Sequence, residues 1–142
     1  MIDQFVGDVM TQSVRTIPPE TTAREVVKLF ADHGIGSAVV VDPDTGEYSG
    51  IVTETDIMQQ VAVGADIDSV RVAAFLSTPL VTIASKEDIH VAATLMKEHS
   101  IRRLPVTDDG DLVGILTTSD LTHYLPRLRN TILRGRNELA TQ

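Results

Sequence analysis

The octet GIVTETDI at residues 50–57 recurs as GILTTSDL at residues 114–121. In both copies a Gly is followed by two aliphatic residues, a Thr, two variable residues, an Asp and a final aliphatic residue. Self-similarity of this kind indicates that one structural unit occurs twice, and it has to be identified before a fold is assigned. The two octets therefore set the register in which the two halves of the chain are compared.

The similarity extends well beyond the octets. Residues 15–42 align with residues 81–108, and each half has the pattern of a short strand, a helix, two strands and a second helix. The first helix of each half has apolar residues at the spacing of one buried face. These residues are Ala23, Val26, Val27 and Phe30 in one half and Ile89, Ala92, Ala93 and Met96 in the other. The sequence therefore predicts a mixed α/β fold (α+β) of two β-α-β-β-α repeats.

The two central strands of each repeat are predicted to form a hairpin, because Asp- and Gly-rich turns separate them. The paired segments are residues 38–41 with 48–53 and residues 104–106 with 112–117. Pro105 falls within one of these strands and has no N–H to donate to a sheet. We therefore expect its strand to lie at a sheet edge or to begin near this residue.

Helix-start signals of the capping-box type recur in both repeats. The predicted pairs are Thr22 with Glu25, Thr53 with Asp56, Ser85 with Asp88 and Thr117 with Asp120. Capping alone would explain the Thr and the Asp of each octet. The alternative is a binding site, because a strand that runs into a helix places free N–H groups and the positive end of the helix dipole at one point. Phosphate suits that point, and a carboxylate beside it suits a ribose diol. Both interpretations stay open at this stage.

Composition narrows the function classes. The chain has 142 residues, a net charge of −8 and no cysteine, so disulfides, thiolate metal sites and thiol catalysis are excluded. The acidic balance argues against general nucleic-acid binding. The sequence has no apolar run of the roughly 18 residues that a membrane span needs, and its start has no basic flank. We therefore expect a cytoplasmic protein with no membrane partner, no signal peptide and no metal site.

Residues 8–125 resemble a tandem pair of CBS domains, the repeat named after cystathionine beta-synthase and often called a Bateman module. The resemblance is carried by the repeat order, the IRRLPV strand at residues 101–106 and the two octets. It implies a first CBS domain at 8–63, a linker at 64–73, a second CBS domain at 74–130 and a tail at 131–142. It also implies that the two repeats pack as a pseudo-twofold pair, with adenosyl ligands such as AMP, ADP, ATP or S-adenosylmethionine in clefts between them.

The resemblance also assigns ligand contacts. It implies that Asp56 and Asp120 bind ribose. Ribose or phosphate would be held by Thr53, Thr55, Thr117, Ser119, Arg102 and Arg103, whereas Thr16, Ile17, Thr82 and Ile83 would flank the adenine. The counterparts of the two arginines in the first repeat are Gly36 and Ser37, so the two sites are not equivalent. Arginine donors suit phosphate, and solvation at the surface is the simpler alternative for both.

The function expected from these features is regulatory, not enzymatic, with no catalytic residue and no catalytic cofactor. The module would bind an adenine nucleotide or S-adenosylmethionine and report it to an unknown target protein. The chief alternative is a dimerising assembly module with vestigial sites, and a nucleic-acid binder that uses the Arg-rich tail is a weaker one. The resemblance also implies a homodimer, because the second helices of the family often face a partner unit and apolar residues continue along them here; packing within the chain is the alternative. These residues are Ile57, Met58 and Val61 in the first repeat and Leu121, Tyr124, Leu125, Leu128 and Ile132 in the second.

Overall fold

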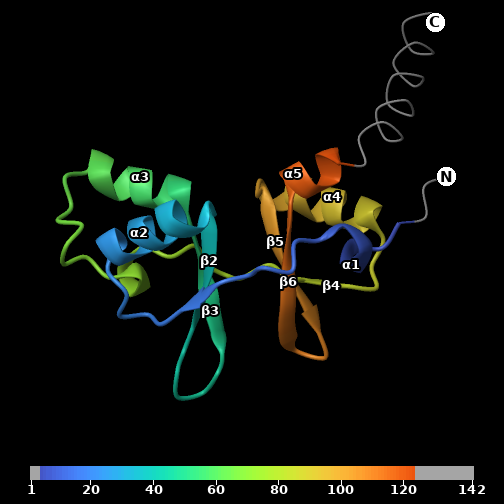
Figure 1. Cartoon of the computed structure of the whole chain (residues 1–142), viewed down its shortest axis with the longest axis horizontal. Coiled ribbons are helices and arrows are strands. Elements are labelled where there is room, and N and C mark those ends of the chain that lie inside the picture. Colours follow the sequence, from blue (N-terminus) through green and yellow to red (C-terminus); the bar gives the residue numbers. More distant parts are fainter. Residues whose placement is uncertain (1–3, 124–142) are drawn as a thin grey trace, which may run out of the picture. The chain divides into compact units, whose positions relative to one another are not determined.

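The computed structural model describes residues 4–123. Its elements are α1 (Val6–Val9), β1 (Thr16–Ile17), α2 (Ala23–His33), β2 (Ser37–Val41), β3 (Tyr48–Thr53), α3 (Glu54–Ala62), a 3-10 turn η1 (Val72–Ala74), β4 (Ile83–Ala84), α4 (Ile89–His99), β5 (Arg103–Asp108), β6 (Asp111–Thr117) and α5 (Thr118–Thr122). The predicted β-α-β-β-α order is confirmed in both repeats (Figure 1). The predicted apolar residues from Tyr124 onward and the Arg-rich tail lie outside the described residues.

The chain divides into two compact units that do not follow the order of the repeats. The first unit is residues 14–81, and the described part of the second unit is residues 4–13 with 82–123. We call residues 6–11 and 72–77, which precede the two repeats, the lead-ins. The first lead-in belongs to the second unit, where Thr11 pairs with Ile115. The second lead-in belongs to the first unit, where Ser77 pairs with Ile51. Each lead-in thus packs against the octet of the other repeat.

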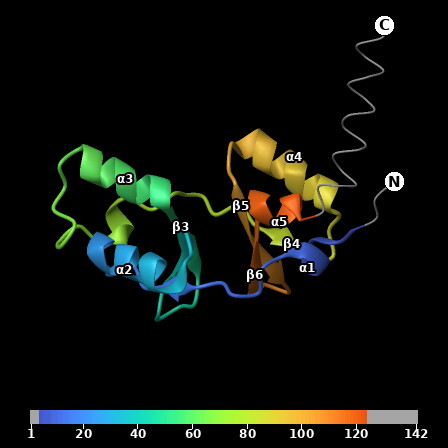
Figure 2. The ribbon, with the colours of Figure 1, turned by 45° about the horizontal axis from the view of Figure 1, so that its top comes forward.

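The first unit is a three-stranded sheet with two helices on one face, as Figures 1 and 2 show. β1 is parallel to β2, and β2 is antiparallel to β3. Its core joins the sheet residues Ala38, Val40 and Val52 to Ala23, Val26 and Phe30 of α2 and Ile57 of α3. Val27, which was predicted on the buried face, is 40% exposed, because the buried face of α2 is narrower than predicted and consists of Ala23, Val26 and Phe30. The buried face of α4 is equally narrow and leaves Ala93 exposed.

The sheet of the second unit has the order β4-β5-β6, so the strand that carries Pro105 is central and not at an edge. It begins at Arg103, close to Pro105, which is the other arrangement that was expected. The first sheet shows how this is tolerated. There the N–H of Val39, the counterpart of Pro105, donates to the carbonyl of Arg15 at 2.9 Å, and Thr16 pairs with Val39. In the second sheet β4 begins one position later, and its first pair is Ile83 with Val106. The parallel ladder therefore starts just beyond the residue that cannot donate.

The cap predicted at the start of α4 is also wrong in detail. Asp88 is the N-cap, and its carboxylate accepts from the N–H of His90 at 2.7 Å. The Ser85 hydroxyl instead donates to the Asp108 carboxylate at 2.6 Å, and Ser85 lies three residues before the N-cap. At α2 the Thr22 hydroxyl accepts from the N–H of Glu25 at 3.3 Å, as predicted.

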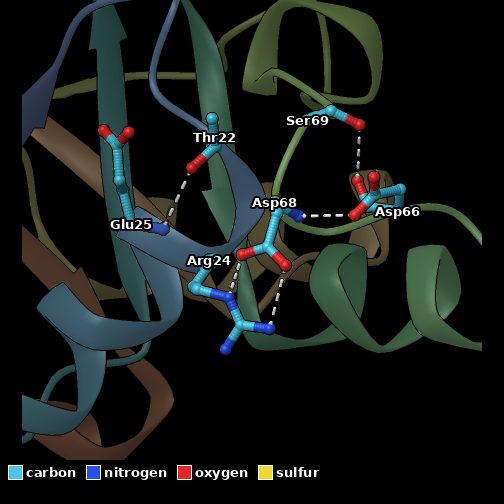
Figure 3. Close-up of polar contacts among 6 residues, drawn as sticks. All are labelled: Thr22, Arg24, Glu25, Asp66, Asp68 and Ser69. Carbon is cyan, nitrogen blue, oxygen red and sulfur yellow. Dashed lines mark hydrogen bonds and ion pairs between the residues drawn. The ribbon is translucent and has the colours of Figure 1, made fainter.

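Residues 64–73, predicted as a linker, contact the start of α2. The carbonyls of Val70 and Ile67 accept from the N–H groups of Ala23 and Arg24, both at 2.9 Å, which satisfies two donors that a helix start leaves free. Figure 3 shows the adjoining ion pair between Arg24 and Asp68. The pair raises the pKa of Arg24 and lowers the pKa of Asp68. Both side chains are 61% exposed, so the backbone bonds and not the ion pair attach this segment.

None of the helices within residues 4–123 is long and apolar enough to cross a membrane.

Candidate functional site

Each octet forms the junction between the last strand of a repeat and its second helix. In the first, the N–H of Thr53 donates to Asp56 Oδ2 at 2.9 Å, and the N–H of Asp56 donates to Thr53 Oγ1 at 3.4 Å. In the second, the N–H of Thr117 donates to Asp120 Oδ2 at 2.9 Å, and the return bond from Asp120 measures 3.1 Å. Both predicted capping boxes are confirmed. The octets are therefore helix caps, whatever else they bind.

A lead-in adds a hydroxyl to each octet carboxylate. Thr11 Oγ1 donates to Asp120 Oδ1 at 2.8 Å in the second unit. Ser77 Oγ donates to Asp56 Oδ1 at 3.0 Å and lies 3.2 Å from Oδ2 in the first unit. Neither hydroxyl was predicted from the sequence. The available signal was that both residues end their lead-ins at the same position of the repeat.

The octet glycines are required by the same close approach. A Cβ added to Gly50 would lie 2.5 Å from the carbonyl oxygen of Ser77, and one added to Gly114 would lie 2.8 Å from that of Thr11. No real side chain tolerates such a distance to backbone. Each lead-in also forms two backbone bonds next to its glycine, of which Ser77 N to Ile51 O at 2.8 Å is one. The Gly of each octet is thus required by the close approach of the lead-in, whereas the Thr and the Asp are required by the helix cap.

The two carboxylates differ in exposure and in their hydrogen bonds. Asp120 is 8% exposed, whereas Asp56 is only half-buried. Asp120 accepts one bond on each oxygen, from Thr11 and from Thr117. At Asp56 the Thr53 hydroxyl also donates to Oδ2, at 3.1 Å, so that this oxygen is more heavily occupied.

The predicted contact residues fall into two groups, one in each unit. The first unit holds Thr16, Ile17, Thr53, Thr55 and Asp56, and the second holds Thr82, Ile83, Arg102, Arg103, Thr117, Ser119 and Asp120. Arg103 pairs with Thr117 across the strands, and the carbonyl of Arg102 accepts from Thr118 at 3.0 Å. Both arginines therefore lie beside the second octet. At the first octet the residue opposite Thr53 is Ser37, which carries no charge.

The residues predicted to flank an adenine are less accessible than expected. Ile17 and Ile83 are buried in the cores of their units. Thr82 lies just before β4, whereas Thr16 is an exposed residue of β1. Contact with a base at these positions is thus limited to backbone atoms and the Thr side chains.

No cluster of three or more His, Asp or Glu side chains within residues 4–123 is arranged to hold a metal ion. A separate apolar hollow lies in the first unit between α2 and α3. Its lining includes Val27, Phe30, Ile57 and Met58. Ile57 is mostly core, whereas Met58 is 64% exposed and Val61, one turn further along α3, is 58% exposed.

The sequence and the fold were compared with those of known proteins. The family model described as CBS domain matches residues 6–63 and 72–127. The CBS domain-containing protein YhcV of Bacillus subtilis is 37% identical over 82% of this chain and 81% of its own length. An uncharacterised protein of Methanopyrus kandleri is 38% identical over 89% of this chain, which spans 65% of that relative. A CBS domain protein of Pyrobaculum aerophilum, solved in complex with AMP, has a TM-score of 0.76 and 30% identity, over 83% of this chain and 90% of that one.

Proposed function

Because the chain belongs to the CBS-domain family, of which it carries two tandem copies, we propose that it is a regulatory module that binds an adenosyl ligand. The observation that carries the proposal is that both octets present a carboxylate at a helix start, in a fold whose Pyrobaculum relative was solved with AMP. AMP is therefore the first ligand to test, followed by ADP, ATP and S-adenosylmethionine.

The chemistry of each predicted contact residue suits one part of the ligand. Asp56 and Asp120 accept hydrogen bonds from ribose hydroxyls, and the exposed hydroxyls of Thr55 and Ser119 lie one residue before them. Arg102 and Arg103 supply positive charge to phosphate at the second octet alone. Thr16 and Thr82, with the backbone of Ile17 and Ile83, flank the base. The second octet is thus the stronger site for a phosphate-bearing ligand.

We propose that ligand binding is signalled by a shift in the populations of two arrangements of the protein. A ligand favours one arrangement of the protein only by binding that arrangement more tightly than the other. The signal would be received by a separate target protein. A cytoplasmic location and the lack of catalytic activity stay predictions.

The test is a thermal-melt panel of the purified protein with AMP, ADP, ATP, S-adenosylmethionine and GTP. A ligand at about 100 times its dissociation constant stabilises a protein by roughly 2.7 kcal/mol. For a chain of this size we expect the melting temperature to rise by about 5–11 °C with adenine ligands. GTP is the matched control and is expected to give no rise. A folded protein that responds to none of these ligands contradicts the proposal and favours the assembly module with vestigial sites.

We further propose that the protein forms a homodimer through the exposed apolar residues of α2 and α3. Met58→Glu places a charge among Val27, Met58 and Val61, and burial of an unpaired charge is costly. We expect light scattering coupled to gel filtration to show a dimer for the wild type and a monomer for this variant. Gln59→Glu makes a similar charge change at the neighbouring exposed position of α3 and is expected to stay dimeric. A Met58→Glu variant that remains a dimer, or a monomeric wild type, contradicts the proposed interface.

A further inference from the structure

The hydroxyls of Ser77 and Thr11 each occupy an acceptor position on an octet carboxylate, the group that would bind a ribose diol. A carboxylate has two oxygens with about four lone-pair positions in all. A diol that donates both hydroxyls to one carboxylate takes two of them. The lead-in hydroxyl and the ligand therefore draw on the same limited set of acceptors.

At Asp56 most of the lone-pair positions of the carboxylate already accept hydrogen bonds. Oδ2 receives the N–H of Thr53 at 2.9 Å, the Thr53 hydroxyl at 3.1 Å and a longer contact from Ser77 at 3.2 Å. Oδ1 receives Ser77 at 3.0 Å, which leaves it one lone pair. A diol can therefore bind Asp56 with both hydroxyls only after Ser77 withdraws.

At Asp120 the same count gives a different result. Oδ1 accepts from Thr11 at 2.8 Å, and Oδ2 accepts from Thr117 at 2.9 Å. Each oxygen keeps one lone pair, so that a diol fits without loss of the Thr11 bond. Thr11 is therefore the matched control that the chain itself provides.

Ser77 also lies on the segment that joins the units. It is exposed, and four residues later the chain passes from the first unit into the second between Val81 and Thr82. Its bond to Asp56 is the side-chain attachment of this segment to the octet, next to the backbone pair with Ile51. Withdrawal of the Ser77 hydroxyl thus loosens the end of the connection.

We propose that the Ser77 hydroxyl is an internal competitor, which ribose displaces from Asp56, so that occupancy of the first octet is transmitted to residues 77–81. The proposal rests on the proposed function, because it takes the adenosyl ligand as given. It makes Ser77 a regulatory residue and not a ligand contact. It also separates the two sites by role: Thr11 lies near the other connection, between Ser13 and Val14, but a diol at Asp120 does not have to displace it.

The test is AMP titration by calorimetry on the full chain and on Ser77→Ala. We expect the variant to bind AMP about fivefold more tightly at one site, since a ligand no longer has to displace a bond of the usual net worth. Thr11→Val, which removes the other hydroxyl at nearly constant shape, is expected to show no gain. Ser77→Ala is expected to have no effect on affinity in an Asp56→Asn background. Ser77→Cys retains more volume with a weak donor and is expected to behave like Ser77→Ala.

Hydrogen exchange of the wild type with and without AMP supplies the second readout. We expect AMP to speed exchange at the backbone amides of Ser77 and Ile51, which donate to each other's carbonyls at 2.8 and 3.1 Å. Wild-type protein that binds AMP together with a Ser77→Ala variant of equal or weaker affinity overturns the inference and leaves the proposed function intact. Unchanged exchange at these amides overturns the transmission step. Wild-type protein that binds no AMP overturns the proposed function, and the inference falls with it.

Discussion

Gly50→Ala lowers the free energy of unfolding by about 2–3 kcal/mol, because the new methyl group meets backbone as well as the side chain of Leu76. The added Cβ would lie 2.5 Å from the carbonyl oxygen of Ser77. That oxygen is held in place, since it accepts from the N–H of Ile51 at 3.1 Å. Relief of the clash requires the second lead-in to move away from β3 and to give up this pair. Urea denaturation of the two proteins measures the difference.

Gly46→Ala is the control for Gly50→Ala. Gly46 lies in the hairpin turn with a φ of +74° and no atom within 4 Å of an added Cβ, so this substitution strains the backbone without a clash. We expect it to cost about 1 kcal/mol. A Gly50→Ala cost no larger than that of Gly46→Ala would show that the lead-in is not fixed against the octet.

The features that the sequence predicted well are those written in short, local patterns. The repeat order follows from apolar periodicity, and the octet capping boxes follow from a Thr and an Asp three residues apart. These patterns can be interpreted without knowing which segments that are distant in the sequence pack against each other. The same holds for the asymmetry between the repeats, since Arg103 and Ser37 do lie opposite the octet residues Thr117 and Thr53.

The features that were missed depend on long-range packing. Thr11 and Asp120 are 109 residues apart, and no local pattern indicates that a lead-in joins the unit of the other repeat. Pro105 was expected at a sheet edge or near the start of its strand, because a central strand needs its donors. The strand is central and begins at Arg103, and a parallel ladder that starts one residue beyond Pro105 removes the need for its donor. At α4, Ser85 was predicted to cap the helix with Asp88 as its partner, whereas Asp88 is the N-cap. The Ser85 hydroxyl donates to Asp108, a residue of β5 that is distant in the sequence.

The structure also changes how the octet carboxylates are interpreted. Capping and ligand binding were alternatives at the level of sequence, and the geometry makes them compatible. Asp120 satisfies its cap with one oxygen and Thr11 with the other, and it still has acceptor capacity. A substitution at this position therefore changes stability and binding together. Its effect on a ligand has to be compared with its effect on the free protein.

Asp120→Ala is expected to lower the free energy of unfolding by about 2–3 kcal/mol, more than the loss of an ordinary helix cap. Asp120 is 8% exposed, so its removal leaves the N–H of Thr117 without a partner at a buried position, and the bond from the exposed Thr11 is lost as well. Asp56→Ala is the matched variant in the other repeat. It is expected to cost about 1 kcal/mol, because Asp56 is only half-buried and water can replace its carboxylate. Urea denaturation of both variants, without ligand, measures the two costs.

A double-mutant cycle separates the Thr11 contact from the cap. If the hydroxyl of Thr11 is part of the cost, Thr11→Val and Asp120→Ala are less than additive, with a coupling of about 1 kcal/mol. Ser77→Ala and Asp56→Ala are expected to show a smaller coupling, since that contact is open to water. Equal costs for the two Asp variants, with no coupling in either cycle, would mean that burial does not distinguish the octets. In that case the difference between the sites would have to come from Arg102 and Arg103, which flank only the second octet.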